Sequence, residues 1–260
     1  MSRSPITSPS NPLIKKVRAL RQRKARIEAG LFIVEGLHHV GEALEAGWEI
    51  DSILYSPDVL TSGFGRDLIS GYESKLQSVS VQVMKSLADK ENPQGIIAVA
   101  HQRSTQLAAL KSLQVGVAVV SPQDPGNVGT ILRTLDAVGA EVLFLLDGGV
   151  DPYHPTSVRA SMGTIFWKPI VQTSFAEFIN WARDLGCQLI ATSAHSQRDY
   201  LELSPDQPWV LVLGGEQKGL SAEQIQACHL SVSLPMRGRA SSLNLAVAAG
   251  ILLYYFTTRK

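Results

Sequence analysis

The chain has 260 residues, 45% of them hydrophobic, which is enough for one large core or two modest ones. Its net charge of +1 is uninformative about nucleic acid, and its longest apolar stretch, residues 243–256, is too short to span a membrane. Two widely separated cysteines and the lack of an apolar signal core exclude a disulfide framework and predict a cytoplasmic protein.

The first hundred residues predict a compact α/β unit. A basic helix is expected over residues 12–29, followed by a strand at 31–34, a helix to residue 46 and a strand at 50–55. The alternation continues with a helix at 67–76, a strand at 79–83, a helix at 85–88 and a strand at 95–100. Residues 1–101 therefore form an N-terminal domain, and the polar segment 102–113 is a linker.

Residues 114–260 predict a second and larger domain. Its strands are expected at 115–120, 141–146, 165–171, 188–192, 209–213 and 230–234. Helices are expected near 128–138, 154–161, 175–185 and 222–228, and a buried helix over 242–256 ends the pattern. Strands that alternate with helices predict a doubly wound, mostly parallel sheet with ligand sites at the carboxyl ends of its strands.

Basic residues are concentrated at the N-terminus. Residues 1–27 hold eight basic residues and no acidic one, whereas the remainder holds 16 basic and 23 acidic residues. This asymmetry favours a polyanion partner, although a solvated basic helix explains the charge equally well. The candidate RNA contacts are Lys15, Lys16, Arg21, Arg23 and Lys24.

Three loops after apolar strands carry glycine and polar residues. They contain Pro125-Gly126-Asn127-Val128-Gly129 with Arg133; Gly214-Gly215-Glu216 with Gly219; and Leu234-Pro235-Met236 followed by Ser242-Leu243-Asn244. A loop before a helix N-terminus suits an anion, and Ser and Asn at the entrance of an apolar helix indicate a cap and a polar site. Taken singly, each loop has an ordinary explanation as a turn, a cap or a surface cation.

In combination, the order and spacing of these loops resemble the motifs of the SpoU (TrmH-like) RNA 2′-O-methyltransferases of the SPOUT superfamily. Residues 151–155 and 159–163 also resemble that family, and residues 10–36 resemble the substrate-binding domain of its ribosomal RNA members. The resemblance therefore covers nearly the whole chain. Thr130 and Leu135-Asp136 depart from the family's usual small residues, outside the expected site.

The resemblance implies a C-terminal trefoil knot, in which the last helix is threaded through an earlier loop. It implies S-adenosyl-L-methionine (AdoMet) as cofactor and methyl transfer to a ribose 2′-hydroxyl, with large-subunit (23S) ribosomal RNA as the expected substrate. It also implies a homodimer that completes the site, and neither membrane nor metal is expected. Apolar residues of the motif helices favour a dimer as well: Ile131, Leu135, Val138, Leu252, Leu253, Tyr254 and Phe256.

The resemblance also implies roles for individual residues. The expected cofactor contacts are Thr192, Ser193, Gly214, Leu234, Met236 and Leu243, with glycines that let the backbone approach the adenosine. The expected catalytic residues are Asn127, Arg133, Glu216, Ser242 and Asn244. Because arginine hardly ever deprotonates, Arg133 is expected to grip a phosphate and the developing alkoxide, with Asn127 holding Arg133 or the ribose.

Three alternatives stay open from the sequence. The first is a tRNA 2′-O-methyltransferase, and the second is a non-catalytic RNA-binding protein that retains the fold, against which the presence of Asn127, Arg133 and Asn244 argues. The third is a Rossmann-type methyltransferase or dehydrogenase, which is disfavoured because no G-x-G-x-x-G follows a predicted strand.

Overall fold

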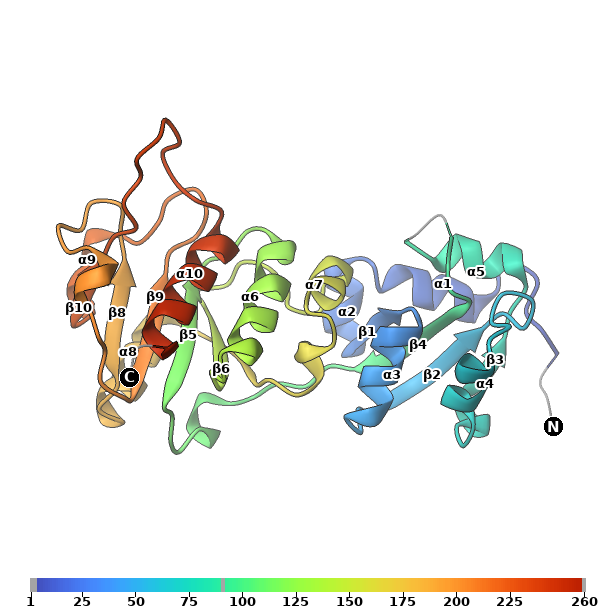
Figure 1. Ribbon diagram of the computed structural model, residues 1–260. Helices are drawn as coiled ribbons and strands as arrows, with labels where there is room; N and C mark the ends of the chain where they lie inside the picture. The colour runs from blue at the N-terminus through green and yellow to red at the C-terminus, as the bar shows by residue number, and fades with distance from the viewer. Residues whose placement is uncertain (1–3, 90–91, 259–260) are drawn as a thin grey trace. The chain divides into compact units, whose positions relative to one another are not determined.

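The computed structural model describes residues 4–89 and 92–258, and its contacts divide the chain into two units (Figure 1). The first unit comprises Met1–Arg103 together with Tyr153–Phe166. The second comprises Ser104–Pro152 and Trp167–Lys260. A short segment from the middle of the sequence therefore packs with the N-terminal unit.

The first unit is built on a four-stranded sheet in the order β1-β4-β2-β3. β1 (Leu31–Glu35) and β2 (Ile50–Tyr55) run antiparallel to β4 (Ile96–His101), and β3 (Leu76–Ser78) runs parallel to β2. Five helices accompany the sheet in the described N-terminal stretch: α1 (Pro12–Ala19), α2 (Arg23–Ala29), α3 (Leu37–Glu45), α4 (Gly63–Ile69) and α5 (Val81–Leu87). α1 and α5 contribute to one apolar core with alternate residues of the strands, and α3 contacts β1 and β4.

The basic helix expected over residues 12–29 is in fact two helices. α1 ends at Ala19, and α2 begins after Gln22, whose backbone is extended. The break lets the buried Arg26 donate from Nη1 to the carbonyl oxygens of Leu20 (2.9 Å) and Arg21 (2.8 Å). These carbonyls follow the end of α1 and lack helical partners, so Arg26 is a structural residue rather than a surface cation.

Two expected strands are also misplaced, and no residue of the strand expected at 79–83 lies in β3, which spans Leu76–Ser78. Residues 81–83 of the strand expected at 79–83 begin α5 instead, because the Ser80 side chain caps that helix by accepting from the Val83 amide (3.3 Å). Residues 165–171 start in the 3-10 turn Thr164–Phe166, and the strand begins only at Ile170. Both errors come from short apolar runs, in which helix and strand patterns are hard to tell apart.

The second unit is a six-stranded parallel sheet in the order β10-β8-β9-β5-β6-β7. Its strands are β5 (Val115–Val120), β6 (Val142–Leu146), β7 (Ile170–Thr173), β8 (Gln188–Thr192), β9 (Trp209–Leu213) and β10 (Leu230–Val232). Because every neighbouring pair is parallel, all carboxyl ends meet at one edge. The predicted α/β class with a mostly parallel sheet is therefore confirmed.

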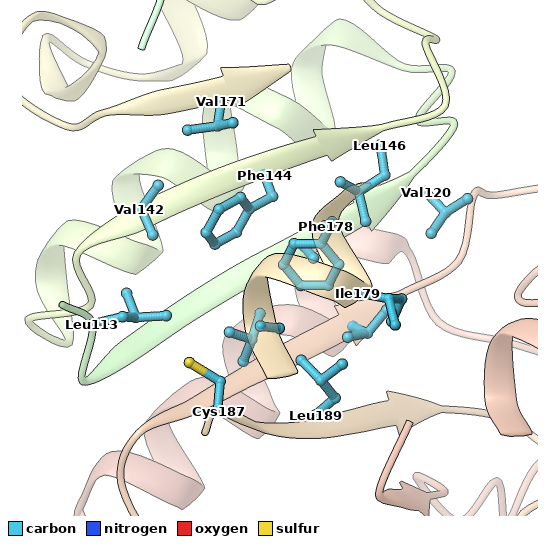
Figure 2. Close-up of a cluster of buried hydrophobic side chains, with 14 residues drawn as sticks. Leu113, Val120, Val142, Phe144, Leu146, Val171, Phe178, Ile179, Cys187 and Leu189 are labelled. Carbon is cyan, nitrogen blue, oxygen red and sulfur yellow. The ribbon is translucent and has the colours of Figure 1, made fainter. Parts of the chain in front are cut away.

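The helices of this unit are α6 (Pro125–Ala137), α8 (Phe175–Asp184), α9 (Ala222–Ala227) and α10 (Leu245–Thr258). α6 and α10 pack against each other, and α10 also contacts β9. Figure 2 shows an apolar cluster in which Phe178 of α8 lies against Phe144 of β6, with ring centroids 4.9 Å apart. The remaining helix, α7 (Pro155–Ala160), belongs to the first unit.

None of the helices in the described part of the chain combines the length and the apolar character that a membrane crossing needs. The trefoil knot implied by the resemblance stays a prediction.

Candidate functional site

One residue from each of the three motif segments takes part in a single hydrogen-bonded relay. Asn244 donates from Nδ2 to Oδ1 of Asn127 (2.9 Å), and Asn127 donates from its own Nδ2 to Oε1 of Glu216 (2.9 Å). These residues follow β10, β5 and β9, so the relay lies at the carboxyl edge of the parallel sheet. The structure therefore brings together three residues that are up to 117 positions apart in the sequence.

The two asparagines occupy different places in their helices. Asn127 lies inside the first turn of α6 and is buried, while the preceding Asp124 is the N-cap. Asn127 is thus neither a loop residue nor a cap. Asn244 does cap α10, since its Oδ1 accepts from the amides of Ala246 (2.9 Å) and Val247 (3.2 Å).

Glu216 accepts hydrogen bonds from three donors. Besides Asn127, the amides of Gln123 (2.9 Å) and Asp124 (3.1 Å) point at its carboxylate. Burial by itself raises the pKa of Glu216, but these hydrogen bonds outweigh it, and the pKa lies below its ordinary value. Glu216 is therefore a stable carboxylate that orients Asn127 and the start of α6, and it is a poor candidate for a base.

A pocket with about 590 Å³ of empty volume, partly open to solvent, lies at the ends of β8 and β10. It contains five of the six expected cofactor residues and Ser242. The full lining is Thr192, Ser193, Ala194, Val232, Leu234, Met236, Ser241, Ser242, Leu243, Ala248 and Leu252. Sequence reasoning missed Val232 and Ala194, although both lie where an apolar strand ends, which is the signal that could have found them.

Gly214 is the expected cofactor residue that does not line this pocket. A Cβ at Gly214 would lie 2.1 Å from the carbonyl carbon of Gly219, and one at Gly215 would lie 2.8 Å from the carbonyl oxygen of Ser121. The glycines are therefore required by close approaches within the protein's own backbone. The expected reason, an approach of the adenosine, is not needed to explain them.

Arg133 lies apart from the relay. It follows Asn127 by six residues on α6, which places it about 240° around the helix and about 9 Å along it. Its side chain is exposed and makes no hydrogen bond or ion pair within the described ranges. Within one chain, the structure therefore brings Arg133 neither to Glu216 nor to the pocket lining.

The expected RNA-binding residues all lie in the first unit. Lys15, Lys16, Arg23 and Lys24 are exposed on α1 and α2. Arg21 is only partly exposed: its Nη2 donates to the Leu87 carbonyl (2.7 Å), and its Nη1 is 3.6 Å from Asp89. Among the exposed cations, Lys24 lies 3.8 Å from Glu28 of the same helix. Arg3, which belongs to the same basic segment, lies outside the described residues.

Across residues 4–89 and 92–258, no group of His, Cys, Asp and Glu side chains could hold a metal ion.

Comparisons with known proteins agree with this architecture. Residues 114–254 match the model of the SpoU rRNA Methylase family, and residues 11–98 match the MRM3-like substrate binding domain. The 23S rRNA (guanosine(2553)-2′-O)-methyltransferase RlmP of Bacillus subtilis is 30% identical over 96% of this chain and 98% of its own length. The 23S rRNA (uridine(2479)-2′-O)-methyltransferase of Streptomyces viridochromogenes is 33% identical over 90% of this chain and 85% of its own length.

A solved structure is similar over the same extent. The crystal structure of AdoMet-bound rRNA methyltransferase from Sinorhizobium meliloti superposes with a TM-score of 0.88 at 35% identity, covering 96% of each chain.

Proposed function

Because the chain belongs to the SpoU rRNA methylase family, we propose that it transfers a methyl group from AdoMet to a ribose 2′-hydroxyl of large-subunit ribosomal RNA. The observation that carries the proposal is the meeting of the three motif loops beside one pocket at the carboxyl edge of the sheet. The two rival interpretations from other classes, a Rossmann-type enzyme and a non-catalytic RNA-binding protein, are wrong.

AdoMet supplies the methyl group on its sulfonium centre, and the pocket fits this cofactor. Leu234, Leu243 and Met236 provide apolar surface, while Thr192 and Ser193 provide hydroxyls. These five residues would hold AdoMet. Ser242 lies in the same lining, directly before the Leu243-Asn244 pair that leads to the relay.

The relay positions the substrate side of the site. An ionised Glu216 fixes Asn127, and Asn127 in turn fixes Asn244 next to the pocket residue Leu243. We assign Asn127 and Asn244 the task of holding the ribose in line with the methyl group. Arg133 has the guanidinium fork to bind a flanking phosphate and the developing alkoxide, and arginine side chains hardly ever deprotonate in proteins, which argues against a role as base.

The enzyme acts as a homodimer through α6 and α10. Support comes from Val247, Ile251 and Tyr254, which are 51%, 38% and 51% exposed and lie on one stripe of α10. Most of the apolar residues on which the sequence-based prediction of a dimer rested do not support it. Five of them are buried in their own chain: Ile131, Leu135, Leu252, Leu253 and Phe256. A dimer formed through this stripe would explain how Arg133, which is exposed on the neighbouring α6, can take part in a catalytic site.

The first unit supplies RNA affinity in this proposal. Lys15, Lys16, Arg23 and Lys24 present exposed cations to phosphates, which position the RNA without reading its bases. We place the enzyme in the cytoplasm, where such a substrate is made.

Mapping of ribose methylations tests the proposed function. A strain that lacks the gene should lose one 2′-O-methyl group in 23S rRNA, and the purified protein with AdoMet should restore it on that RNA. If the strain loses a 2′-O-methyl group from tRNA instead, the substrate is tRNA and not ribosomal RNA. An RNA population identical to that of the parent strain, with no transfer by the purified protein, would overturn the proposal.

A further inference from the structure

The loop that joins β10 to α10 is held in the site at both ends (Figure 1, red). Near its start, Leu234 and Met236 line the cofactor pocket. Near its end, Ser242 and Leu243 line the same pocket, and Asn244 is hydrogen bonded to Asn127. The loop between these points extends away from the sheet (Figure 1).

The tip of this loop is exposed and positively charged. Arg237, Gly238 and Arg239 are all exposed, and no acidic residue occurs anywhere in the chain after Glu223. Neither arginine forms a hydrogen bond or an ion pair with any residue in the described ranges. Two guanidinium groups are therefore available a few residues from the pocket lining.

The loop's own conformation is held by few polar contacts. Within the part of the chain that the structure describes, residues 234–243 make no hydrogen bond at all, and they form no helix or strand. Their backbone donors and acceptors are open to water or to ligands. A ligand that contacts this segment thus adds polar interactions without having to break any, so it can bias the loop strongly.

We propose that Arg237 and Arg239 bind phosphates of the RNA next to the target nucleotide, and that RNA on the tip and AdoMet at the base of this loop strengthen each other's binding. The inference rests on the proposed function, which supplies both ligands. Arginine suits the role because its planar fork binds phosphate oxygens with two hydrogen bonds. The strengthening is reciprocal, because coupling between two bound ligands is one free energy shared by both.

The test compares the double variant Arg237→Gln/Arg239→Gln with the wild type. Arg183→Gln is the matched control, since Arg183 is exposed on α8 of the same unit and lines neither the pocket nor the loop. RNA affinity is measured over a range of salt with unmodified 23S rRNA transcript. The affinity for S-adenosylhomocysteine, which cannot donate a methyl group, is measured by calorimetry with and without that transcript.

The double variant should bind RNA with a salt slope smaller by about 1.4 to 1.8, which corresponds to two lost phosphate contacts. Its affinity for S-adenosylhomocysteine alone should equal that of the wild type. In the wild type and in Arg183→Gln, RNA should tighten S-adenosylhomocysteine binding, and the double variant should lose this effect.

An unchanged salt slope in the double variant would overturn the inference, and the tip would then be a solvated loop. A loss of S-adenosylhomocysteine affinity without RNA would overturn it as well, since the arginines would then serve the cofactor. Wild-type protein that transfers no methyl group to RNA would instead refute the proposed function, which separates the two failures.

Discussion

Both the oxygen and the nitrogen of the Asn127 side-chain amide are hydrogen bonded, and the neighbouring residues determine the orientation of that amide. The N-terminus of α10 needs an acceptor, so Asn244 turns Oδ1 toward the amides of Ala246 and Val247. Its Nδ2 is left to donate to Asn127 Oδ1, and Asn127 Nδ2 then meets the carboxylate of Glu216. The relay therefore has one direction, set by a helix end and a negative charge.

Asn244→Asp should separate the cap from the relay. Aspartate caps a helix about as well as asparagine, so the midpoint of thermal unfolding should stay near that of the wild type. A carboxylate cannot donate to Asn127, so methyl transfer should fall by roughly tenfold or more, the value of one hydrogen bond in a site. Single-turnover transfer and calorimetric unfolding measure the two effects.

Asn244→Ala is the matched comparison, because it loses the relay and the cap together and should also lose about 1 kcal/mol of stability. Full turnover by Asn244→Asp would show that the relay does not position the substrate.

Glu216 should make the stability of the second unit depend on pH. Its pKa is lowered in the folded chain, so its contribution is present above the ordinary glutamate pKa of about 4.3 and is lost as the pH falls through the lowered value. Glu216→Gln should therefore unfold at a lower temperature than the wild type at pH 7. The two melting curves should converge below about pH 4. A gap that stays constant from pH 7 to acid would contradict this.

At the scale of elements, the break between α1 and α2 depends on one buried cation. Arg26 satisfies two carbonyls that α1 leaves open, and Arg21 donates to the carbonyl of Leu87, the last residue of α5. The basic segment thus divides its charges between two tasks. Some hold the N-terminal helices against α5, and the exposed ones face solvent, where the proposed RNA contacts lie.

Arg26→Met should destabilise the first unit by about 2 kcal/mol or more, because the buried carbonyl of Leu20 and the partly buried carbonyl of Arg21 lose their donor. Lys15→Met, which removes an exposed cation from α1, should change stability by no more than about 0.5 kcal/mol. Chemical denaturation that follows the unfolding of the first unit measures the stability of both variants. Equal stabilities for the two variants would mean that Arg26 does not hold the turn.

At the scale of the whole molecule, the first unit includes a segment from the middle of the chain. Tyr153 packs on Phe32, with ring centroids 4.5 Å apart, and Phe166 packs on Trp48 at 5.3 Å. Arg159 of the same segment is paired with Asp89 at 2.6 Å. If the chain were truncated at the linker, the rings of Phe32 and Trp48 would lose these aromatic partners. The first unit therefore includes residues that lie beyond the linker in the sequence.

Ile251→Arg should break the proposed homodimer. Ile251 lies at the centre of the exposed stripe of α10, where a charge would be desolvated in an interface. Light scattering should give the mass of a monomer, methyl transfer should fall by at least tenfold, and AdoMet binding should remain, since Ile251 does not line the pocket. Phe64→Arg, which changes an exposed apolar residue of the first unit, should leave the mass unchanged. If the Ile251→Arg variant were still a dimer, the interface could not lie on this stripe of α10.

Local pattern was sufficient for most of the elements and for the edge of the sheet that carries the site. Apolar runs such as residues 115–120 and 209–213 are strands in the structure, and the polar segments after them contain Asn127 and Glu216. These features depend on neighbours in the sequence, so periodicity and turn residues encode them. The resemblance to a family added the cofactor and the chemistry.

Other features depend on which surfaces meet, and no local pattern encodes that. The partner of Asn127 Oδ1 is Asn244, which lies 117 residues later, and Gly214 is required by a backbone five residues away that folds back on it. Arg26 is one of the eight basic residues among residues 1–27, and only the structure shows that it is buried and satisfies two carbonyls. The segment Tyr153–Phe166 joins the first unit because its aromatic rings are buried there. For Gly214 and Arg26 the deciding contact is with nearby residues that the folded backbone brings close. For Asn127 and the segment Tyr153–Phe166 it is the burial of a polar or apolar group by a distant segment, which exists only once the chain has folded.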